Sequence, residues 1–344
     1  MKALHVVETQ DPEAPPSARL RLVEVPRPEP EPGEVVIRME AAPANPSDLA
    51  YLVGRYGVPT RYGEGVGFEG CGTVVSARAG LLGRWLEGKR VACAGVGRGG
   101  TWAEFFRTSA KACLPIDRSI DAAQAATFLI NPFTALGLLD RARKVGTAAV
   151  IQNAGASQVG RLVIRLAAMR GVPVISTVRR AEQAEDLRAI GAEHVLVTSA
   201  AGYVDRLRGL AERLDARVAF DAVAGEDTAR LLEAMPDRSL AIVYGGLSMT
   251  PDDPYGGVYP VGGLIFSGHR IEGFWLTTSL ARLGPLRILA RSRYLQRLVR
   301  EGALETTIQS SSGIEDYPEA LDAYWADMSA GKAILELERN RETD

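Results

Sequence analysis

Short apolar runs alternate with helical patterns through the middle of the chain, from about residue 121 to residue 276. Strands that alternate with helices favour a parallel sheet with helices on both faces. The predicted strands are residues 148–152, 172–178, 193–198, 218–223, 240–244 and 270–276. Six strands of this kind predict an α/β fold with a doubly wound dinucleotide-binding domain, which we place at residues 125–280.

The segment Asn153-Ala-Gly-Ala-Ser-Gln-Val-Gly160 lies between the first of these strands and a helical pattern at residues 158–169. A dinucleotide site needs a tight turn at this place, because backbone N–H groups and the helix dipole must face the pyrophosphate. The strict glycine pattern is broken here, and an ordinary turn is the alternative interpretation. The strand–turn–helix context favours a dinucleotide site.

The end of the second predicted strand indicates which nicotinamide cofactor binds. NAD sites carry a carboxylate there for the ribose 2′-OH, whereas NADP sites carry Arg. This chain has Arg179 and Arg180, with no acid before Glu182. Two guanidinium groups can bind a 2′-phosphate bidentately. Two solvated charges are the alternative, but the missing carboxylate favours NADPH.

The segments on either side of this domain are predicted to form a second, β-rich domain from residues 1–124 and 281–344. Its clearest strands are residues 34–39, 72–76 and 90–94, which are β-branched and bounded by Gly or Pro. The apolar run at residues 333–337 comes too late for the parallel sheet, so we expect it to return to the first domain.

Composition excludes several classes of protein. A net charge of −2 gives no general reason to expect nucleic acid or an anionic membrane as a partner. No run of 18 apolar residues is present, so no membrane span is expected. The three cysteines are an odd set for disulfides, and the acidic start lacks the apolar core of a signal peptide. We therefore expect a cytoplasmic protein.

Motifs in both predicted domains resemble the medium-chain dehydrogenase/reductase superfamily, and within it the mitochondrial-type 2-enoyl thioester reductases. The matches run in family order over nearly the whole chain. They are Asn45-Pro-Ser-Asp48, Gly54-Arg-Tyr56-Gly57, Gly100-Thr-Trp102, Asn131-Pro-Phe-Thr134, Val150-Ile-Gln-Asn153, Tyr244-Gly-Gly246, Leu264-Ile-Phe266, Gly273-Phe-Trp-Leu276 and Gly331-Lys332. The resemblance implies a Rossmann domain joined to a GroES-like catalytic domain, and it suggests a homodimer paired through the strand at residues 270–276.

Carried over residue by residue, the resemblance implies that Tyr56 is the catalytic tyrosine. It places Asn45 and Trp275 near the substrate, and it lets Lys332 close the site. The implied cofactor residues are Asn131, Thr134, Ala156, Ser157, Gln158, Val159, Arg179, Arg180, Tyr244, Gly245, Gly246, Leu247, Phe274, Trp275, Leu276 and Lys332. The turn carries Gln158 where family members often have Gly. This departure affects the identity of the acyl substrate more than the type of reaction.

Zinc-dependent members of the superfamily use a Cys near the position of Asn45 and a Gly-His-Glu motif further on. This chain has Asn45 and Gly67-Phe68-Glu69 instead, and the four-cysteine structural loop is missing. A zinc site needs three or four N, S or O ligands, and Glu69 alone cannot hold the ion. No metal is therefore expected. Glu69 is interpreted as a buried remnant of a zinc site or a loop anchor, with a catalytic role as the less favoured alternative.

The resemblance implies reduction of a C=C bond in a 2-enoyl thioester, carried by CoA or an acyl carrier protein, with hydride addition to the β-carbon. A quinone or enone reductase is the nearest alternative, since it would share the fold, NADPH and the absence of zinc. A non-catalytic NADPH-binding protein is a third. The sequence leaves the acyl chain and its carrier undetermined. The Arg-rich helical segment at residues 282–300 has two interpretations, either a solvated helix face or a contact for CoA phosphates or an acidic carrier.

Overall fold

The chain divides into two compact units in a computed structural model that describes residues 1–11, 13–95, 99–248 and 260–338. Unit 1 comprises Met1–Ile130 and Leu289–Asp344, and unit 2 comprises Asn131–Ile288. The predicted boundaries at 124/125 and 280/281 fall inside two helices, α3 (Ala122–Ala126) and α10 (Leu276–Ala281). The first helix of the alternating region, α3, still belongs to unit 1, and unit 2 begins only at Asn131. The change from strands to helices in the sequence therefore precedes the boundary between the units.

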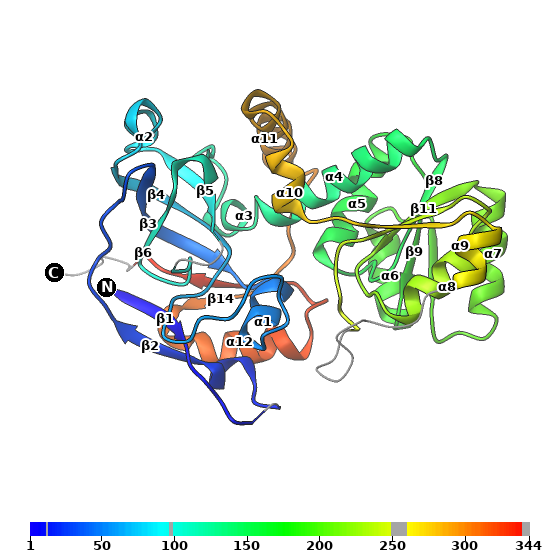
Figure 1. Cartoon of the computed structure of the whole chain (residues 1–344), viewed down its shortest axis with the longest axis horizontal. Coiled ribbons are helices and arrows are strands. Elements are labelled where there is room, and N and C mark those ends of the chain that lie inside the picture. Colours follow the sequence, from blue (N-terminus) through cyan, green and yellow to red (C-terminus); the bar gives the residue numbers. More distant parts are fainter. Residues whose placement is uncertain (12, 96–98, 249–259, 339–344) are drawn as a thin grey trace. The chain divides into compact units, whose positions relative to one another are not determined.

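Unit 2 is built on a six-stranded parallel sheet in the order β10-β9-β8-β11-β12-β13. Its strands are β8 (Ala149–Gln152), β9 (Val174–Val178), β10 (His194–Val197), β11 (Ala216–Asp221), β12 (Leu240–Val243) and β13 (Arg270–Gly273). Every residue of β8 and β9 is buried, which requires cover on both faces of the sheet. Helices provide that cover (Figure 1), so the predicted doubly wound fold is confirmed.

The helices of unit 2 follow its strands in regular alternation. They are α4 (Ile130–Val145), α5 (Gln158–Ala168), α6 (Ala181–Ala189), α7 (Tyr203–Arg213), α8 (Glu226–Ala234), α9 (Val261–Phe266) and α10. Leu207 and Ala211 of α7 and Leu231 of α8 share one buried apolar cluster with residues of β8, β9 and β11. Apolar residues spaced four apart on α7 thus face the sheet, which is the helical spacing that the sequence shows.

The last predicted strand, at residues 270–276, is too long. β13 ends at Gly273, and Trp275 is the N-cap of α10. The backbone turns there because the carbonyl of Trp275 accepts hydrogen bonds from the Ser279 N–H, at 3.0 Å, and from the Thr278 hydroxyl, at 2.9 Å. Trp275 therefore lies at a helix start rather than in the sheet.

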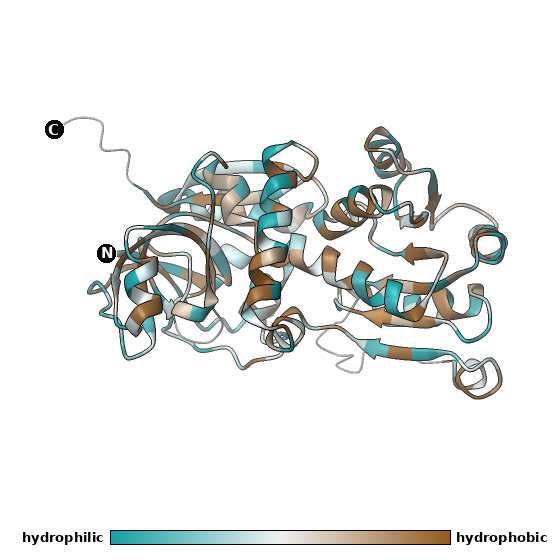
Figure 2. Cartoon of the chain, turned by 90° about the horizontal axis from the view of Figure 1, so that it is seen from above, coloured by the Kyte–Doolittle hydropathy of each residue, from teal (hydrophilic) through white to brown (hydrophobic). Residues whose placement is uncertain are grey.

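Unit 1 contains the β-rich fold. A seven-stranded sheet runs β14-β15-β3-β4-β5-β7, with β6 also paired to β3, and a separate hairpin joins β1 to β2. Its strands are β1 (Lys2–Val6), β2 (Leu20–Glu24), β3 (Glu34–Pro43), β4 (Glu69–Ala77), β5 (Arg90–Ala94), β6 (Phe105–Ser109), β7 (Cys113–Pro115), β14 (Ile308–Gly313) and β15 (Lys332–Glu336). The surrounding helices carry both apolar and polar residues, in brown and teal in Figure 2.

The C-terminal strand returns to the first domain, as predicted. β15 pairs antiparallel with β3, and Ile334 lies opposite Pro43.

The helices of unit 1 are α1 (Pro46–Leu52), α2 (Gly80–Leu86), α3 and α12 (Tyr317–Ala326). A further helix, α11 (Pro285–Arg300), begins in unit 2 and continues into unit 1. Short 3-10 turns lie at Pro16–Arg19, Ala110–Ala112 and Ile314–Asp316. The Arg-rich segment at residues 282–300 is not a single helix, because Arg282 is the C-cap of α10 and α11 begins only at Pro285.

Candidate active site

The turn between β8 and α5 has the geometry that a dinucleotide requires. Ser157 is the N-cap of α5, and its side chain accepts a hydrogen bond from the Gly160 N–H at 3.1 Å. A Cβ at Gly160 would lie 2.4 Å from the carbonyl oxygen of Gly155, so only glycine fits there. The turn thus brings the amino end of α5 to the carboxyl edge of the sheet, where doubly wound folds bind ligands.

A buried network fixes the strand ends beside this turn. The carboxylate of Asp221 accepts hydrogen bonds from Asn153 Nδ2 at 2.6 Å and from Thr228 Oγ1 at 2.5 Å. It also accepts from the backbone N–H groups of Val223 and Ala224, at 2.9 and 2.8 Å. Sequence reasoning missed Asp221, although an acid directly after the apolar run Val218-Ala-Phe220 was the available signal.

Arg179 and Arg180 directly follow β9, and both are exposed. Their backbone N–H groups donate to the same oxygen, Gln183 Oε1, each at 3.2 Å. Gln183 therefore fixes the backbone from which the two guanidinium groups extend. An exposed pair of cations at this strand end fits a 2′-phosphate.

Asn131 and Thr134 are buried in the first turns of α4. The Nδ2 of Asn131 has no hydrogen-bond partner among the described residues. A buried donor without a partner is rare in folded proteins, and a bound polar group is one ordinary reason for it. This amide, the turn before α5 and the arginine pair together fit a phosphorylated dinucleotide.

The segment after β12 lies next to the turn. Burial and the charge of Asp221 raise the pKa of Tyr244, while a hydrogen bond with Ser157 opposes that rise. Gly245 and Gly246 follow in partly buried backbone, and Leu247 is exposed. A Cβ at Gly245 would lie 2.6 Å from the Ala222 carbonyl oxygen, so glycine is required for this close approach.

Phe274 and Trp275 differ in their surroundings. The ring of Phe274 packs over Gly137 of α4, where an added Cβ would come within 2.8 Å of it. Trp275 is 43% exposed and Leu276 is partly buried. Phe274 therefore contacts α4, whereas Trp275 is partly exposed to solvent.

Tyr56 lies in unit 1, in the segment that follows α1. Its partly buried ring packs on Phe68, with ring centroids 4.8 Å apart and the planes tilted by 38°. Gly54 precedes it with a φ of +74°, which places the turn in the left-handed region that favours glycine. Phe68 thus fixes the position of the Tyr56 ring.

Asn45 and Lys332 lie together in a buried cluster of unit 1. The Nζ of Lys332 donates to Asn45 Oδ1, to the Ala44 carbonyl at 3.0 Å and to the Tyr324 hydroxyl at 3.1 Å. Asn45 Nδ2 donates to Glu69 Oε1 at 2.9 Å. An ammonium has three N–H donors, so all three of those on Lys332 are used by protein oxygens. Tyr324 is a member of this cluster that sequence reasoning missed.

Comparison with known proteins identifies the family. Residues 31–118 match the alcohol dehydrogenase GroES-like domain, and residues 159–286 match the zinc-binding dehydrogenase family. The mitochondrial enoyl-[acyl-carrier-protein] reductase of Homo sapiens is 30% identical over 88% of this chain and 81% of its own length. That of Xenopus tropicalis is 31% identical over 92% and 91%. The chain belongs to the medium-chain dehydrogenase/reductase superfamily.

Solved structures agree with this assignment. A candidate NADPH:quinone reductase from Mesorhizobium loti superposes with a TM-score of 0.88, at 32% identity and over 98% of both chains. A quinone oxidoreductase from Thermus thermophilus, solved also with NADPH, gives a TM-score of 0.77 at 26% identity over 98% of this chain and 100% of that one. The superfamily member described here is therefore an oxidoreductase that uses a nicotinamide cofactor.

The name of the matched family raises the question of zinc, and the residues of this chain do not fit the ion. Among the described residues, no three His, Cys, Asp or Glu side chains gather closely enough to hold a metal. Asn45 and Glu69 are hydrogen bonded to each other, and Lys332 donates to Asn45. An ammonium beside these oxygens repels a second cation, so we derive no step through zinc.

Protein dialysed against zinc should retain far less than one Zn²⁺ per chain, and EDTA should leave the rate of NADPH oxidation unchanged. The reason is that the buried oxygens are already occupied by protein donors. Metal analysis by mass spectrometry measures the first quantity and a cofactor assay the second. A stoichiometric zinc content, with activity lost in EDTA, would contradict this prediction.

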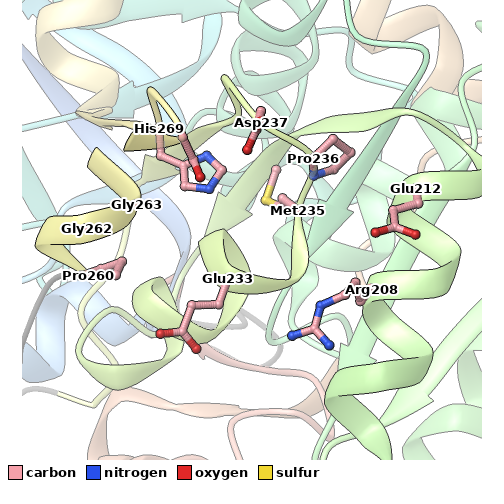
Figure 3. A pocket seen from close by; sticks show the side chains of 11 residues that line it. Arg208, Glu212, Glu233, Met235, Pro236, Asp237, Pro260, Gly262, Gly263 and His269 are labelled. Atoms are coloured by element: carbon pink, nitrogen blue, oxygen red, sulfur yellow. The ribbon is translucent and has the colours of Figure 1, made fainter. Parts of the chain in front are cut away.

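A separate pocket of unit 2 opens at the other edge of the parallel sheet (Figure 3). Asp237 and His269 line it from segments that precede β12 and β13, while Arg208, Glu212 and Glu233 come from α7 and α8. Burial lowers the pKa of His269, and Asp237 opposes that shift. Doubly wound sheets bind cofactors at the carboxyl ends of their strands, so this pocket is not the dinucleotide site.

Proposed function

We propose that the chain catalyses NADPH-dependent reduction of the C=C bond of a 2-enoyl thioester, with CoA or an acyl carrier protein as the acyl carrier. The observation that carries the proposal is Tyr56, which stands in the family's Gly-x-Tyr motif with its ring seated on Phe68. The relatives named enoyl-[acyl-carrier-protein] reductase, at about 30% identity, support it.

The reaction adds a hydride to the β-carbon and a proton to the α-carbon, and negative charge builds on the thioester oxygen between these events. NADPH supplies the hydride when it is bound. In our proposal the turn before α5 binds the pyrophosphate, and Arg179 and Arg180 bind the 2′-phosphate. The phenol O–H of Tyr56 donates a hydrogen bond to the developing oxyanion or protonates the enolate.

NADPH oxidation measured against crotonyl-CoA, a longer enoyl-CoA and a quinone tests the proposal directly. We expect the highest kcat/KM with one of the enoyl thioesters. A quinone reductase is the second candidate, because the Mesorhizobium loti and Thermus thermophilus proteins carry that name. A higher kcat/KM with the quinone than with either thioester would favour this second candidate.

We further propose a homodimer formed through β13. This strand is at the end of the described sheet order, and α9 beside it exposes three apolar side chains, Val261, Ile265 and Phe266, at 63%, 66% and 87%. An unpaired strand edge next to exposed apolar residues favours pairing with a second chain. A two-fold axis would let both copies use the same surface.

Light scattering at micromolar concentration should therefore give twice the mass of the chain, and Phe266→Asp should shift the protein toward monomer. Leu81→Asp is the matched control, because Leu81 is 84% exposed on α2 in unit 1. A monomer mass for the unaltered protein, or equal effects of the two substitutions, would contradict the dimer through β13.

The three cysteines bear on the cell compartment in which the protein works. Cys71, Cys93 and Cys113 are all free thiols and all buried. Burial raises the pKa of Cys71 and of Cys113 to about 12, which keeps both thiols protonated and unreactive. Within the described residues, no helix is both long and apolar enough to cross a bilayer. We propose a reducing compartment such as the cytoplasm.

A further inference from the structure

A cluster of ionisable side chains lies in the interior of unit 1. Asp48 and Glu69 are fully buried, Lys332 is 2% exposed, and Asn45 and Tyr324 are each 1% exposed. A buried charge is costly unless it is paired and hydrogen bonded. Two carboxylates and one ammonium in one interior cluster therefore need a structural or functional reason.

Each of the four carboxylate oxygens accepts at least one hydrogen bond. Asp48 Oδ2 accepts from the Asn45 N–H at 2.8 Å, and Oδ1 accepts from the Phe68 N–H at 2.9 Å. Glu69 Oε1 accepts from Asn45 Nδ2, and Oε2 accepts from the Ile130 N–H, both at 2.9 Å. A protonated carboxyl group would direct a donor at one of these N–H groups. The arrangement therefore favours the ionised form of both acids.

Lys332 is the cation that favours this ionised form. Burial raises the pKa of Asp48 to about 7 and also raises the pKa of Glu69, whereas the charge of Lys332 lowers both. Burial in turn lowers the pKa of Lys332, and the two carboxylates oppose that shift. Removing the ammonium would leave two buried acids without a compensating charge, and their hydrogen bonds to backbone N–H groups would weaken.

Two of the backbone N–H groups that the carboxylates hold, those of Phe68 and Ile130, lie next to predicted site residues. Phe68, held by Asp48, is the residue on whose ring Tyr56 packs. Ile130, held by Glu69, is the first residue of α4 and directly precedes Asn131. A change in either carboxylate therefore reaches a segment that carries a predicted catalytic or cofactor residue.

We propose that Lys332 is an internal cation that positions the active site through Asp48 and Glu69, rather than a residue that binds NADPH directly. It is thus a positioning residue, which holds Phe68 beneath Tyr56 and the amide of Ile130 at the start of α4. The part that concerns catalysis rests on the proposed function. The part that concerns the two backbone amides does not.

The test compares Lys332→Met, Glu69→Gln and the double variant with the unaltered full-length protein. Glu40→Gln is the matched control, because the Glu40 carboxylate lies in the same sheet but pairs with Arg90 at 2.7 Å and accepts a hydrogen bond from Thr73 Oγ1. The readouts are kcat and KM with crotonyl-CoA, Kd for NADPH, and hydrogen exchange of residues 54–68 and 128–135 in protein without cofactor.

For Lys332→Met we expect a loss in kcat of roughly ten- to a hundredfold, since misplacing a catalytic group by about 1 Å can cost about 10²-fold. Kd for NADPH should change less than about threefold, and the amides of Phe68 and Ile130 should exchange faster. The double variant should lose less than the product of the two single losses, because both substitutions act on the same contacts. Glu40→Gln should leave kcat and both amides unchanged.

Some results would overturn the proposal. If Lys332→Met raises Kd for NADPH tenfold or more while exchange at Phe68 and Ile130 stays unchanged, Lys332 is a cofactor ligand. If Lys332→Met does not fold, the double variant replaces it in the comparison, because it buries one charge instead of three. Unchanged hydrogen exchange at Phe68 and Ile130 in the double variant would also contradict the proposal. An unaltered protein that reduces no enoyl thioester defeats the proposed function, but the exchange comparison still decides the positioning role.

Discussion

Replacing Arg179 and Arg180 together with Ala should weaken NADPH binding strongly and leave NADH binding nearly unchanged. Each guanidinium can make charge-assisted hydrogen bonds to the 2′-phosphate, which contribute about 1.5–3 kcal/mol each. Both side chains are exposed, so solvent screening should bring the loss toward the lower end of that range. NADH lacks the 2′-phosphate and offers these arginines no comparable contact. Titration calorimetry with both cofactors measures the difference.

The control for this prediction is a second pair of exposed arginines in unit 2. Arg206 and Arg213 lie on α7, outside the turn that follows β9. Their replacement by Ala changes the net charge by the same amount, so it reports any general electrostatic effect on a dinucleotide that carries several negative charges. Equal losses for NADPH and NADH in the Arg179/Arg180 variant would show that these two residues support the backbone only.

The parallel sheet was readable from the sequence because its central strands are buried on both faces. Every residue of β8 and β9 is buried, both strands begin with apolar residues, and their predicted bounds are right to within two residues. β13 is the strand at the end of the described order and is only partly buried, so no apolar run marks where it ends. This explains why the prediction continued it through Trp275, where a helix begins.

The candidate site likewise has one part that was predictable from the sequence and one part that was not. The turn before α5 was recognisable because Gly160 meets a steric requirement that acts within a few residues. The cluster around Lys332 depends on pairing between β15 and β3, which brings Lys332 to Asn45 although 287 positions separate them in the sequence. No local pattern encodes that contact. The sequence predicts that Glu69 is buried and, through the resemblance, that Asn45 and Lys332 belong to the site. It does not predict the hydrogen bonds that join the three side chains.

Tyr56→Phe should lower kcat by at least about tenfold while the fold stays intact. Loss of one oxyanion-stabilising donor typically costs on the order of 10²–10³ in kcat, and a water molecule can partly replace the phenol. KM for the enoyl thioester and Kd for NADPH should move little, because the hydroxyl acts mainly when charge has developed. Phe keeps the ring that packs on Phe68, so the surrounding core should not change.

Tyr51→Phe is the matched control for this substitution. The Tyr51 ring also packs on Phe68, with centroids 5.5 Å apart, but its hydroxyl accepts a hydrogen bond from the Arg61 N–H at 2.9 Å. Loss of that hydroxyl should affect stability more than kcat. If Tyr56→Phe leaves kcat unchanged while an isotope effect with deuterated NADPH shows that hydride transfer is rate-limiting, Tyr56 is not the oxyanion donor. If KM alone rises, Tyr56 binds the substrate and the proton comes from another group.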